Sequence, residues 1–144
     1  MNRFRKITAL ALTLVVITML GISASAASFS QTINGDFGVF AVCEGNLSAN
    51  AITAWAAMFE ADYDYIEVVG QELYVEYTYA LVGSTTGYTR HRTATARDGT
   101  VDLNFGPPSG CVFSSATYKY DAYYIANGVA DCHLYHGPVA LVIP

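Results

Sequence analysis

Along most of the chain after residue 26, apolar and polar residues alternate with a period of two. The clearest case is the segment ELYVEYTYAL, residues 72–81. Its odd positions form one apolar face: Leu73, Val75, Tyr77, Tyr79 and Leu81. Most of its even positions form a more polar face: Glu72, Tyr74, Glu76 and Thr78. Because successive side chains of a strand point to opposite sides, this pattern predicts a β-strand with one buried and one solvated face.

Other segments show the same alternation or a strand-like composition, and turn residues separate them. These segments are SFSQTI (28–33), FGVFAVC (37–43), TVDLNF (100–105), CVFSSATYKYDAYY (111–124) and GPVALVIP (137–144). Glycine and proline mark turns at 34–36 (NGD), 98–99 (DG) and 106–110 (GPPSG). All eleven tyrosines lie after residue 26, and tyrosine, threonine and valine favour strands.

The segment SANAITAWAAMFEAD, residues 48–62, allows two interpretations. Its alanines favour a helix that Ser48 would cap. As a strand it is apolar on both faces, which is typical of a central strand covered on both sides. We prefer the strand. Seven or eight short strands with Gly, Pro and Asn turns then predict an all-β fold, an antiparallel β-sandwich.

The first 26 residues have the pattern of a secretory signal peptide. Three basic residues precede an apolar run from Ile7 to Ile22, and the small residues Ala24-Ser25-Ala26 form a cleavage motif. We therefore expect a signal helix that is cleaved after residue 26, an extracellular product, and one β-sandwich domain over 27–144. No membrane attachment is expected after cleavage.

Removal of this segment leaves four basic residues against twelve acidic ones, a formal charge of −8 with neutral histidines. Nucleic acids and anionic membrane surfaces repel such a protein, so we predict neither as a partner. The sequence indicates no cofactor, and it does not indicate an oligomeric state.

Four segments together resemble a known group of proteins: GNLSANAITAWAAMF, DYIEVVGQEL, GYTRHRTATARDGTV and SSATYKYDAY. Their order over residues 43–124 is similar to that in small, signal-bearing β-sandwich proteins of Gram-positive bacteria, which look immunoglobulin-like in strand order. The resemblance implies the fold and the extracellular location. It carries over no active site.

Three cysteines remain after residue 26: Cys43, Cys111 and Cys132. One intramolecular disulfide is therefore expected in an extracellular protein, with one thiol left over. We prefer Cys111–Cys132 because the two strands that carry them are expected to be neighbours. The alternative Cys43–Cys111 would resemble the inter-sheet bridge of an immunoglobulin domain.

The segment CHLYHG, residues 132–137, places a cysteine and two histidines within five positions. On a strand, Cys132 and His136 share a face but lie about 13 Å apart, and His133 points to the opposite face. Zinc needs its ligands in one tetrahedron, so we predict a strand here and no metal site.

Acidic residues gather at FEADYDYIE, residues 59–67. Glu60, Asp62 and Asp64 are weak candidates for a calcium site, because calcium prefers carboxylate oxygens. Tyr65 stands where an EF-hand loop needs glycine. With Glu67, the same acids are also candidates for the paired carboxylates of a polysaccharide hydrolase.

The composition favours a small non-catalytic binding module over an enzyme. Tyrosine combines apolar area with a polar group, and the strand pattern leaves Tyr63, Tyr65, Tyr74 and Tyr123 on outward faces or in loops. We therefore expect these four to bind an extracellular glycan, peptide or protein. The alternatives are a secreted polysaccharide hydrolase that uses the 60–67 acids, and a secreted antagonist such as an inhibitor or bacteriocin-like toxin.

Overall fold

A computed structural model describes residues 26–60, 65–97 and 99–144. These residues form eight strands and no helix, so the all-β prediction is confirmed. The strands are β1 Ala26–Asn34, β2 Val39–Ser48, β3 Ile52–Glu60, β4 Ile66–Leu81, β5 Gly87–Ala96, β6 Thr100–Phe105, β7 Cys111–Ala126 and β8 Ala130–Val142. The predicted signal peptide lies outside the described residues except for Ala26. Within the described part of the chain, no helix is of a length and apolarity that would span a membrane.

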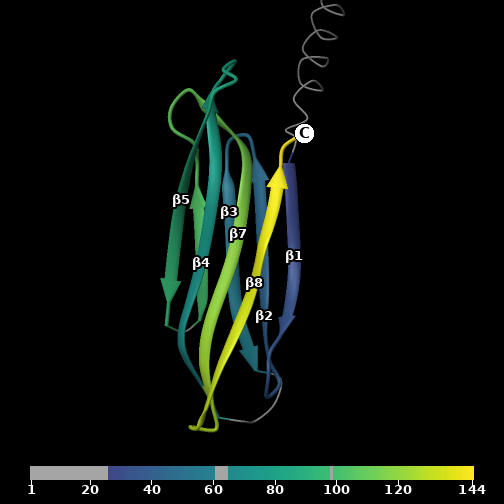
Figure 1. The fold of residues 1–144 in the computed structure, drawn as a ribbon, viewed down its shortest axis with the longest axis vertical. Helices are drawn as coiled ribbons and strands as arrows, with labels where there is room; N and C mark the ends of the chain where they lie inside the picture. The colour runs from purple at the N-terminus through teal and green to yellow at the C-terminus, as the bar shows by residue number, and fades with distance from the viewer. Residues whose placement is uncertain (1–25, 61–64, 98) are drawn as a thin grey trace, which may run out of the picture.

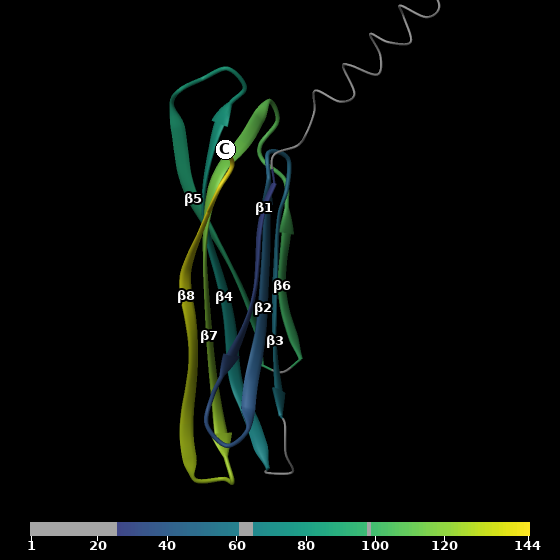
Figure 2. The same cartoon turned by 90° about the vertical axis from the view of Figure 1, so that its right-hand side faces the viewer.

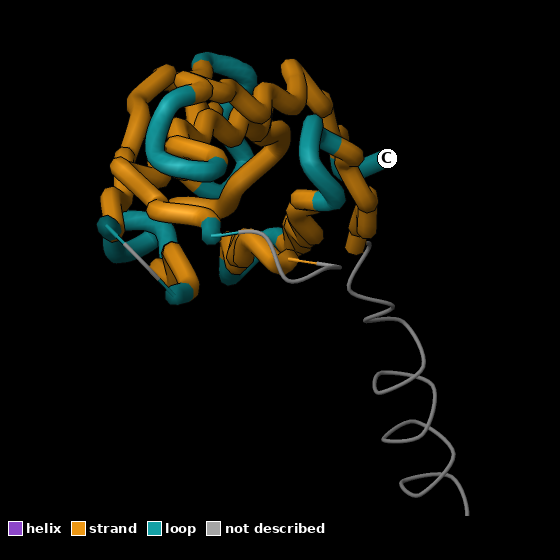
Figure 3. Tube along the Cα trace, turned by 90° about the horizontal axis from the view of Figure 1, so that it is seen from below, coloured by secondary structure: helices purple, strands orange, loops and turns teal. Residues whose placement is uncertain are grey.

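The strands form two antiparallel sheets of four strands each. One sheet has the order β1-β2-β3-β6 and the other has the order β5-β4-β7-β8. Figure 1 shows the long strands running side by side along the molecule, and Figure 2 shows the two sheets as two separate layers. Seen from below, the strands surround the interior, and loops join them at the ends (Figure 3). The predicted two-layer sandwich is therefore confirmed.

Strand β3 settles the two interpretations of residues 48–62. It pairs with β2 on one side and with β6 on the other, so it is a central strand. The expectation that it is covered on both faces is wrong, because no described strand packs on its outer face (Figure 2). Trp55 is half-buried there, and Phe59 is 42% exposed.

The core lies between the layers, where β7 contributes the largest side chains. Tyr118, Tyr120 and Tyr124 are each about 1% exposed. Tyr118 and Tyr120 share the inward face of β7 with Ala116 and Ala122, the face on which the alternation of residues 111–124 places all four. Facing them, the inward positions of β2 and β3 are mostly small, and they include Ala41, Cys43, Gly45, Ala54 and Ala56.

The hydroxyls of Tyr118, Tyr120 and Tyr124 each have a hydrogen-bond partner, as burial of a polar group requires. Tyr118 Oη donates to the Asn46 carbonyl of the opposite sheet at 3.1 Å. Tyr124 Oη donates to the Asp36 carbonyl at 3.1 Å. These two bonds join β7 to the β1-β2-β3-β6 side of the molecule.

At Gly45 a ring of the opposite layer lies close to the β2 backbone. A Cβ atom at this position would meet Cε1 of Phe29 and would lie 2.9 Å from Cε1 of Tyr118. The rings of Phe29 and Tyr118 pack edge to face there, with centroids 5.2 Å apart. Only a residue without a side chain lets both rings reach the β2 backbone.

The predicted Cys111–Cys132 disulfide is wrong, and all three cysteines are free. β7 and β8 are neighbours as expected, but Cys132 pairs with Tyr124, whereas Cys111 begins β7 and pairs with Leu81. Cys111 and Tyr124 are thirteen positions apart, which corresponds to about 40 Å of strand. A disulfide requires Cα atoms within about 7 Å.

The CHLYHG segment is part of β8, so the strand prediction is confirmed. Cys132 and His136 point inward, and His133 points outward, as the alternation predicted. His133 Nε2 donates to Asp121 Oδ1 at 2.6 Å, whereas His136 Nε2 is buried and has no hydrogen-bond partner.

Candidate functional site

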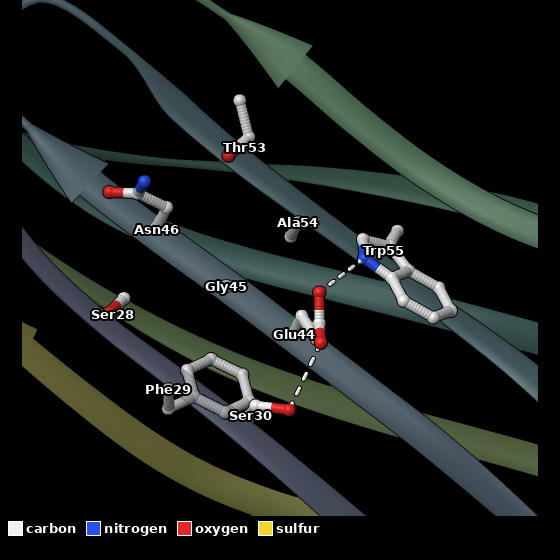
Figure 4. Close-up of a pocket in the computed structure, with 9 residues that line it drawn as sticks. All are labelled: Ser28, Phe29, Ser30, Glu44, Gly45, Asn46, Thr53, Ala54 and Trp55. Atoms are coloured by element: carbon white, nitrogen blue, oxygen red, sulfur yellow. Dashed lines mark hydrogen bonds between the residues drawn. The ribbon is translucent and has the colours of Figure 1, made fainter.

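The outer face of the β1-β2-β3-β6 sheet carries a groove that runs across its first three strands. Antiparallel register aligns Ser28, Asn46 and Thr53 in one row of outward side chains. Two positions along each strand, the register aligns a second row of outward side chains, made of Ser30, Glu44 and Trp55. Figure 4 shows the two rows on either side of the groove.

Glu44 lies at the centre of the second row and holds that row in place. Its Oε1 accepts a hydrogen bond from Ser30 Oγ at 3.0 Å, and its Oε2 accepts one from Trp55 Nε1 at 2.8 Å (Figure 4). Bonds to an ionised acceptor are stronger than neutral ones, so the carboxylate fixes the indole in one orientation. A fixed aromatic ring binds a ligand with less entropy loss than a mobile one.

The floor of the groove consists of the inward-facing residues between the two rows: Phe29, Gly45 and Ala54. Gly45 and Ala54 carry little or no side chain, and Phe29 turns its ring toward the core. The depression therefore reaches down to the strand backbones and has a volume of about 510 Å³. Small-molecule sites in proteins have volumes of about 300–1,000 Å³.

The charge around the groove is entirely negative. The strands β1, β2, β3 and β6 contain no Lys, Arg or His, and their ionisable carboxylates are Glu44, Glu60 and Asp102. Asp102 lies directly opposite Trp55 on β6. An anionic ligand would meet no positive charge on these four strands, so the groove suits a neutral or cationic ligand.

The lining residues supply hydrogen bonds and an aromatic surface. Ser28, Ser30 and Thr53 each have a hydroxyl that donates and accepts, Asn46 has an amide that does both, and Glu44 accepts. Glu44 is the single carboxylate among the nine lining residues, so they lack the paired acids of a glycoside hydrolase.

The predicted binding tyrosines lie elsewhere, on or near the other sheet. Tyr74 and Tyr123 both point outward from the β5-β4-β7-β8 sheet, and Tyr123 is 53% exposed. Tyr65 precedes β4 and is 70% exposed, and Tyr63 lies outside the described residues. The structure therefore brings two of the four predicted tyrosines to one face.

Tyr74 is held by aromatic and charged neighbours. Its ring stacks with His91 at a centroid distance of 5.5 Å, and Lys119 Nζ lies 5.3 Å from the ring centroid. Partial desolvation and then the nearby Glu76 carboxylate raise the pKa of the Tyr74 phenol. Tyr74 therefore remains a neutral hydrogen-bond donor at physiological pH.

The acidic candidates are divided between the two sheets. Glu60 ends β3 in one sheet, and Glu67 lies in β4 of the other, where Arg97 Nη2 is 3.7 Å from its Oε1. Asp62 and Asp64 lie outside the described residues, so the calcium and hydrolase hypotheses for this segment depend on positions that are not described. Among the described residues, no group of three or more metal-binding side chains is present.

The groove does not follow from the sequence, although its aromatic residue has a local signal. Alternation places Trp55 on the face of β3 opposite Ala54 and Ala56, and the prediction of two covered faces left no room for a groove there. A single tryptophan at an outward strand position is a signal that could have been followed. Its partners Ser30 and Glu44 become visible only when the strand register is known.

Compared with known protein families and with curated proteins, the chain matches no family model and no curated protein.

Proposed function

We propose that this protein is a small non-catalytic module that binds a saccharide chain through the Trp55 groove. The observation that carries the proposal is the Trp55–Glu44–Ser30 row, in which a carboxylate holds an indole and a hydroxyl along one wall of a groove of about 510 Å³. The opposite wall adds two hydroxyls and one amide (Figure 4).

This arrangement matches the chemistry of sugars. A pyranose ring has an apolar C–H face that packs on an aromatic ring and an equator of hydroxyls that donate and accept hydrogen bonds. The groove offers an indole for the first and five polar side chains in two rows for the second. A chain of sugar units would lie across the strands, between the rows.

The negative charge of this sheet sets the expected preference. Neutral saccharides and amino sugars should bind more tightly than uronic acids, because Glu44 and Asp102 repel carboxylates. This preference distinguishes a specific site from non-specific adsorption to an exposed aromatic ring, which would bind neutral saccharides, amino sugars and uronic acids alike.

The test uses the single tryptophan of the chain as its reporter. The purified protein is titrated with three kinds of hexasaccharide: neutral β-1,4-linked glucose and N-acetylglucosamine hexamers, a glucosamine hexamer, and a galacturonate hexamer. Tryptophan emission should change with the neutral and amino hexamers, and calorimetry should give the same affinities. The galacturonate hexamer should bind at least about tenfold more weakly.

Variants then assign the binding to the groove. Trp55→Ala should weaken binding at least about 30-fold, as expected when a central aromatic contact is removed. Phe59→Ala is the matched control, because it removes another outward aromatic of β3 that lies outside the groove. If no hexamer binds, or if Trp55→Ala behaves like Phe59→Ala, the proposal is wrong.

We also propose that the protein works outside the cell and is related to the small secreted immunoglobulin-like sandwich proteins that its sequence resembles. The signal pattern of residues 1–26 supports the location, and two antiparallel sheets of four strands are compatible with the relationship. Detection of the protein in culture medium with Ala27 as its first residue tests the location.

A further inference from the structure

We infer that the opposite face of the sandwich holds a second saccharide site, a slot between Tyr123 and Gly70, so that one molecule bridges two saccharide chains. This inference rests on the proposed function for its ligand class. It depends on different residues, which lie on the other sheet.

Tyr123 has an unusual pair of neighbours across the β5-β4-β7-β8 sheet. It points outward from β7 and is 53% exposed. Its register partner on β8 is His133, and its register partner on β4 is Gly70. The tyrosine therefore has an aromatic ring on one side and no side chain on the other.

The Tyr123 ring is fixed by its contact with His133. The two rings stack with centroids 4.4 Å apart and an angle of 7° between their planes. His133 is itself held by its 2.6 Å hydrogen bond to Asp121. Since parallel rings face each other across the strands, the second face of Tyr123 turns toward β4 and the position of Gly70.

The space above Gly70 is open. No atom lies within 4 Å of a Cβ atom built at this position, and the depression there has a volume of about 600 Å³. Its lining includes Tyr123, Gly70, Glu72, Thr95, Arg97 and Asp121. The register between β4 and β7 shifts between Val68 and Gly70, and glycine is common at such a bulge. The missing side chain leaves room for an occupant beside Tyr123.

The lining of the slot points to a sugar ring. The free face of Tyr123 would stack on its C–H face, as His133 stacks on the other. Glu72 and Asp121 are directly opposite each other on β4 and β7 and would accept hydrogen bonds from its hydroxyls. Thr95 would donate or accept on the β5 side.

The groove and the slot cannot serve one short ligand together. They lie on the outer faces of the two layers, which point away from each other in Figure 2. A protein with both sites occupied would therefore hold two saccharide chains, one on each side. Linked sites of this kind raise the overall avidity for a surface that displays many chains.

The test separates the two sites with one variant for each. Trp55→Ala disables the groove. Gly70→Leu fills the slot, and the fold tolerates it because Gly70 is not in the left-handed region and a Cβ atom there meets nothing. Tyr123→Ala is a second slot variant with the opposite change in volume. Val129→Ala is the matched control, because Val129 is exposed in the β7–β8 turn and lines neither site.

The readouts are the stoichiometry and bridging with the neutral hexasaccharides of the panel above. Calorimetry should give two equivalents for the unchanged protein and for Val129→Ala, and one for each of the three site variants. Monomeric protein should capture fluorescent hexamer onto hexamer-coated beads, and each site variant should lose this capture at least about tenfold.

The outcomes distinguish the second site from the first. If Gly70→Leu and Tyr123→Ala still bind two equivalents, or if the unchanged protein binds one equivalent that Trp55→Ala abolishes, the slot is not a site, whereas the groove proposal stands. If His133 ring signals in NMR spectra shift on titration but tryptophan emission does not, the groove proposal fails and the slot stands. If neither reporter responds to any hexamer, both proposals are wrong.

Discussion

The two sheets of this protein have the same number of strands and the same antiparallel pairing, but one contributes large side chains to the core and the other contributes small ones. The β5-β4-β7-β8 sheet supplies bulk, with three tyrosines from β7 that are about 1% exposed. The β1-β2-β3-β6 sheet leaves room for these tyrosines, because several inward positions of β2 and β3 that face them are glycine or alanine. The layers fit because large residues oppose small ones, as close packing requires.

The outer faces differ in charge as strongly as the inner faces differ in size. Every Lys, Arg and His within the described strands belongs to β5, β7 or β8, which are three strands of the same sheet. The other sheet is purely acidic. Two strand layers with one architecture can therefore present chemically different surfaces, and the sandwich itself does not decide which ligand either surface binds.

The largest expected effect comes from the two glycines that distinguish the sheets. Gly45→Val should lower the free energy of unfolding by about 3 kcal/mol, because its Cβ atom collides with Phe29 and Tyr118. Gly70→Ala should raise it by about 0.5 kcal/mol, because the added methyl meets nothing and the unfolded chain loses freedom. Urea unfolding of both variants measures the contrast. Equal effects would mean that Phe29 and Tyr118 do not limit the space at Gly45.

The buried tyrosines of β7 should differ according to what their hydroxyls contact. Tyr120 Oη donates to Gln71 Oε1 at 2.7 Å, and Gln71 is 3% exposed. Tyr120→Phe leaves that oxygen buried without its donor, so we expect a loss of about 1–3 kcal/mol. Tyr118→Phe frees the carbonyl of the exposed Asn46, where water can replace the hydroxyl, and should cost about 1 kcal/mol. Chemical denaturation of both variants would contradict this account if Tyr118→Phe were the more damaging.

Alkaline pH should weaken the packing of the small-residue sheet through Cys43. Burial raises the pKa of the Cys43 thiol from 9.0 to about 12. The unfolded chain therefore loses this proton first, and the free energy of unfolding falls as pH rises above 9, by roughly 1 kcal/mol at pH 10. In Cys43→Ala the free energy of unfolding should fall less between pH 9 and pH 10. Identical slopes for the two proteins between pH 9 and 10 would refute the role of this thiol.

Acidic pH should act on the opposite sheet through His136. Desolvation lowers the pKa of this histidine below 6.5, and its buried Nε2 has no hydrogen-bond partner. The unfolded chain binds the proton more readily, so the free energy of unfolding falls as pH drops below 6.5. His136→Phe should remove this dependence and, by removing the orphaned nitrogen, leave stability at pH 7 equal or up to about 1 kcal/mol higher. Thermal unfolding at pH 5 and pH 7 checks both points.

The sequence predicted the strands and their inward residues because the period of two is a local property. Residues 72–81 and 111–124 needed no knowledge of their neighbours, and their buried faces are confirmed through Tyr77 and Tyr124. The inward position predicted for Leu81 is wrong, because β4 shifts register between Thr78 and Tyr79 and Leu81 is 55% exposed. Register is not local. Cys111 and Cys132 do lie on neighbouring strands, but β7 is 16 residues long and the register puts them at opposite ends.

The candidate site was harder to predict for the same reason. Trp55, Glu44 and Ser30 come from three strands, and a shift of two residues in either pairing would separate them. Tyr74 and Tyr123 were found because exposure follows from alternation alone. The role that we infer for Tyr123 depends on a missing side chain at Gly70, which only the pairing of β4 with β7 brings beside it.

The position of Gly45 constrains how this groove can change. Its backbone is at once the floor of the groove and the surface on which Phe29 and Tyr118 rest. Depth is thus fixed by the interior, whereas the side chains of Ser28, Asn46 and Thr53 on the rim point outward and can be exchanged. In engineered or evolved variants, we therefore expect ligand preference to change through substitutions of these rim residues, while the depth of the groove stays nearly constant.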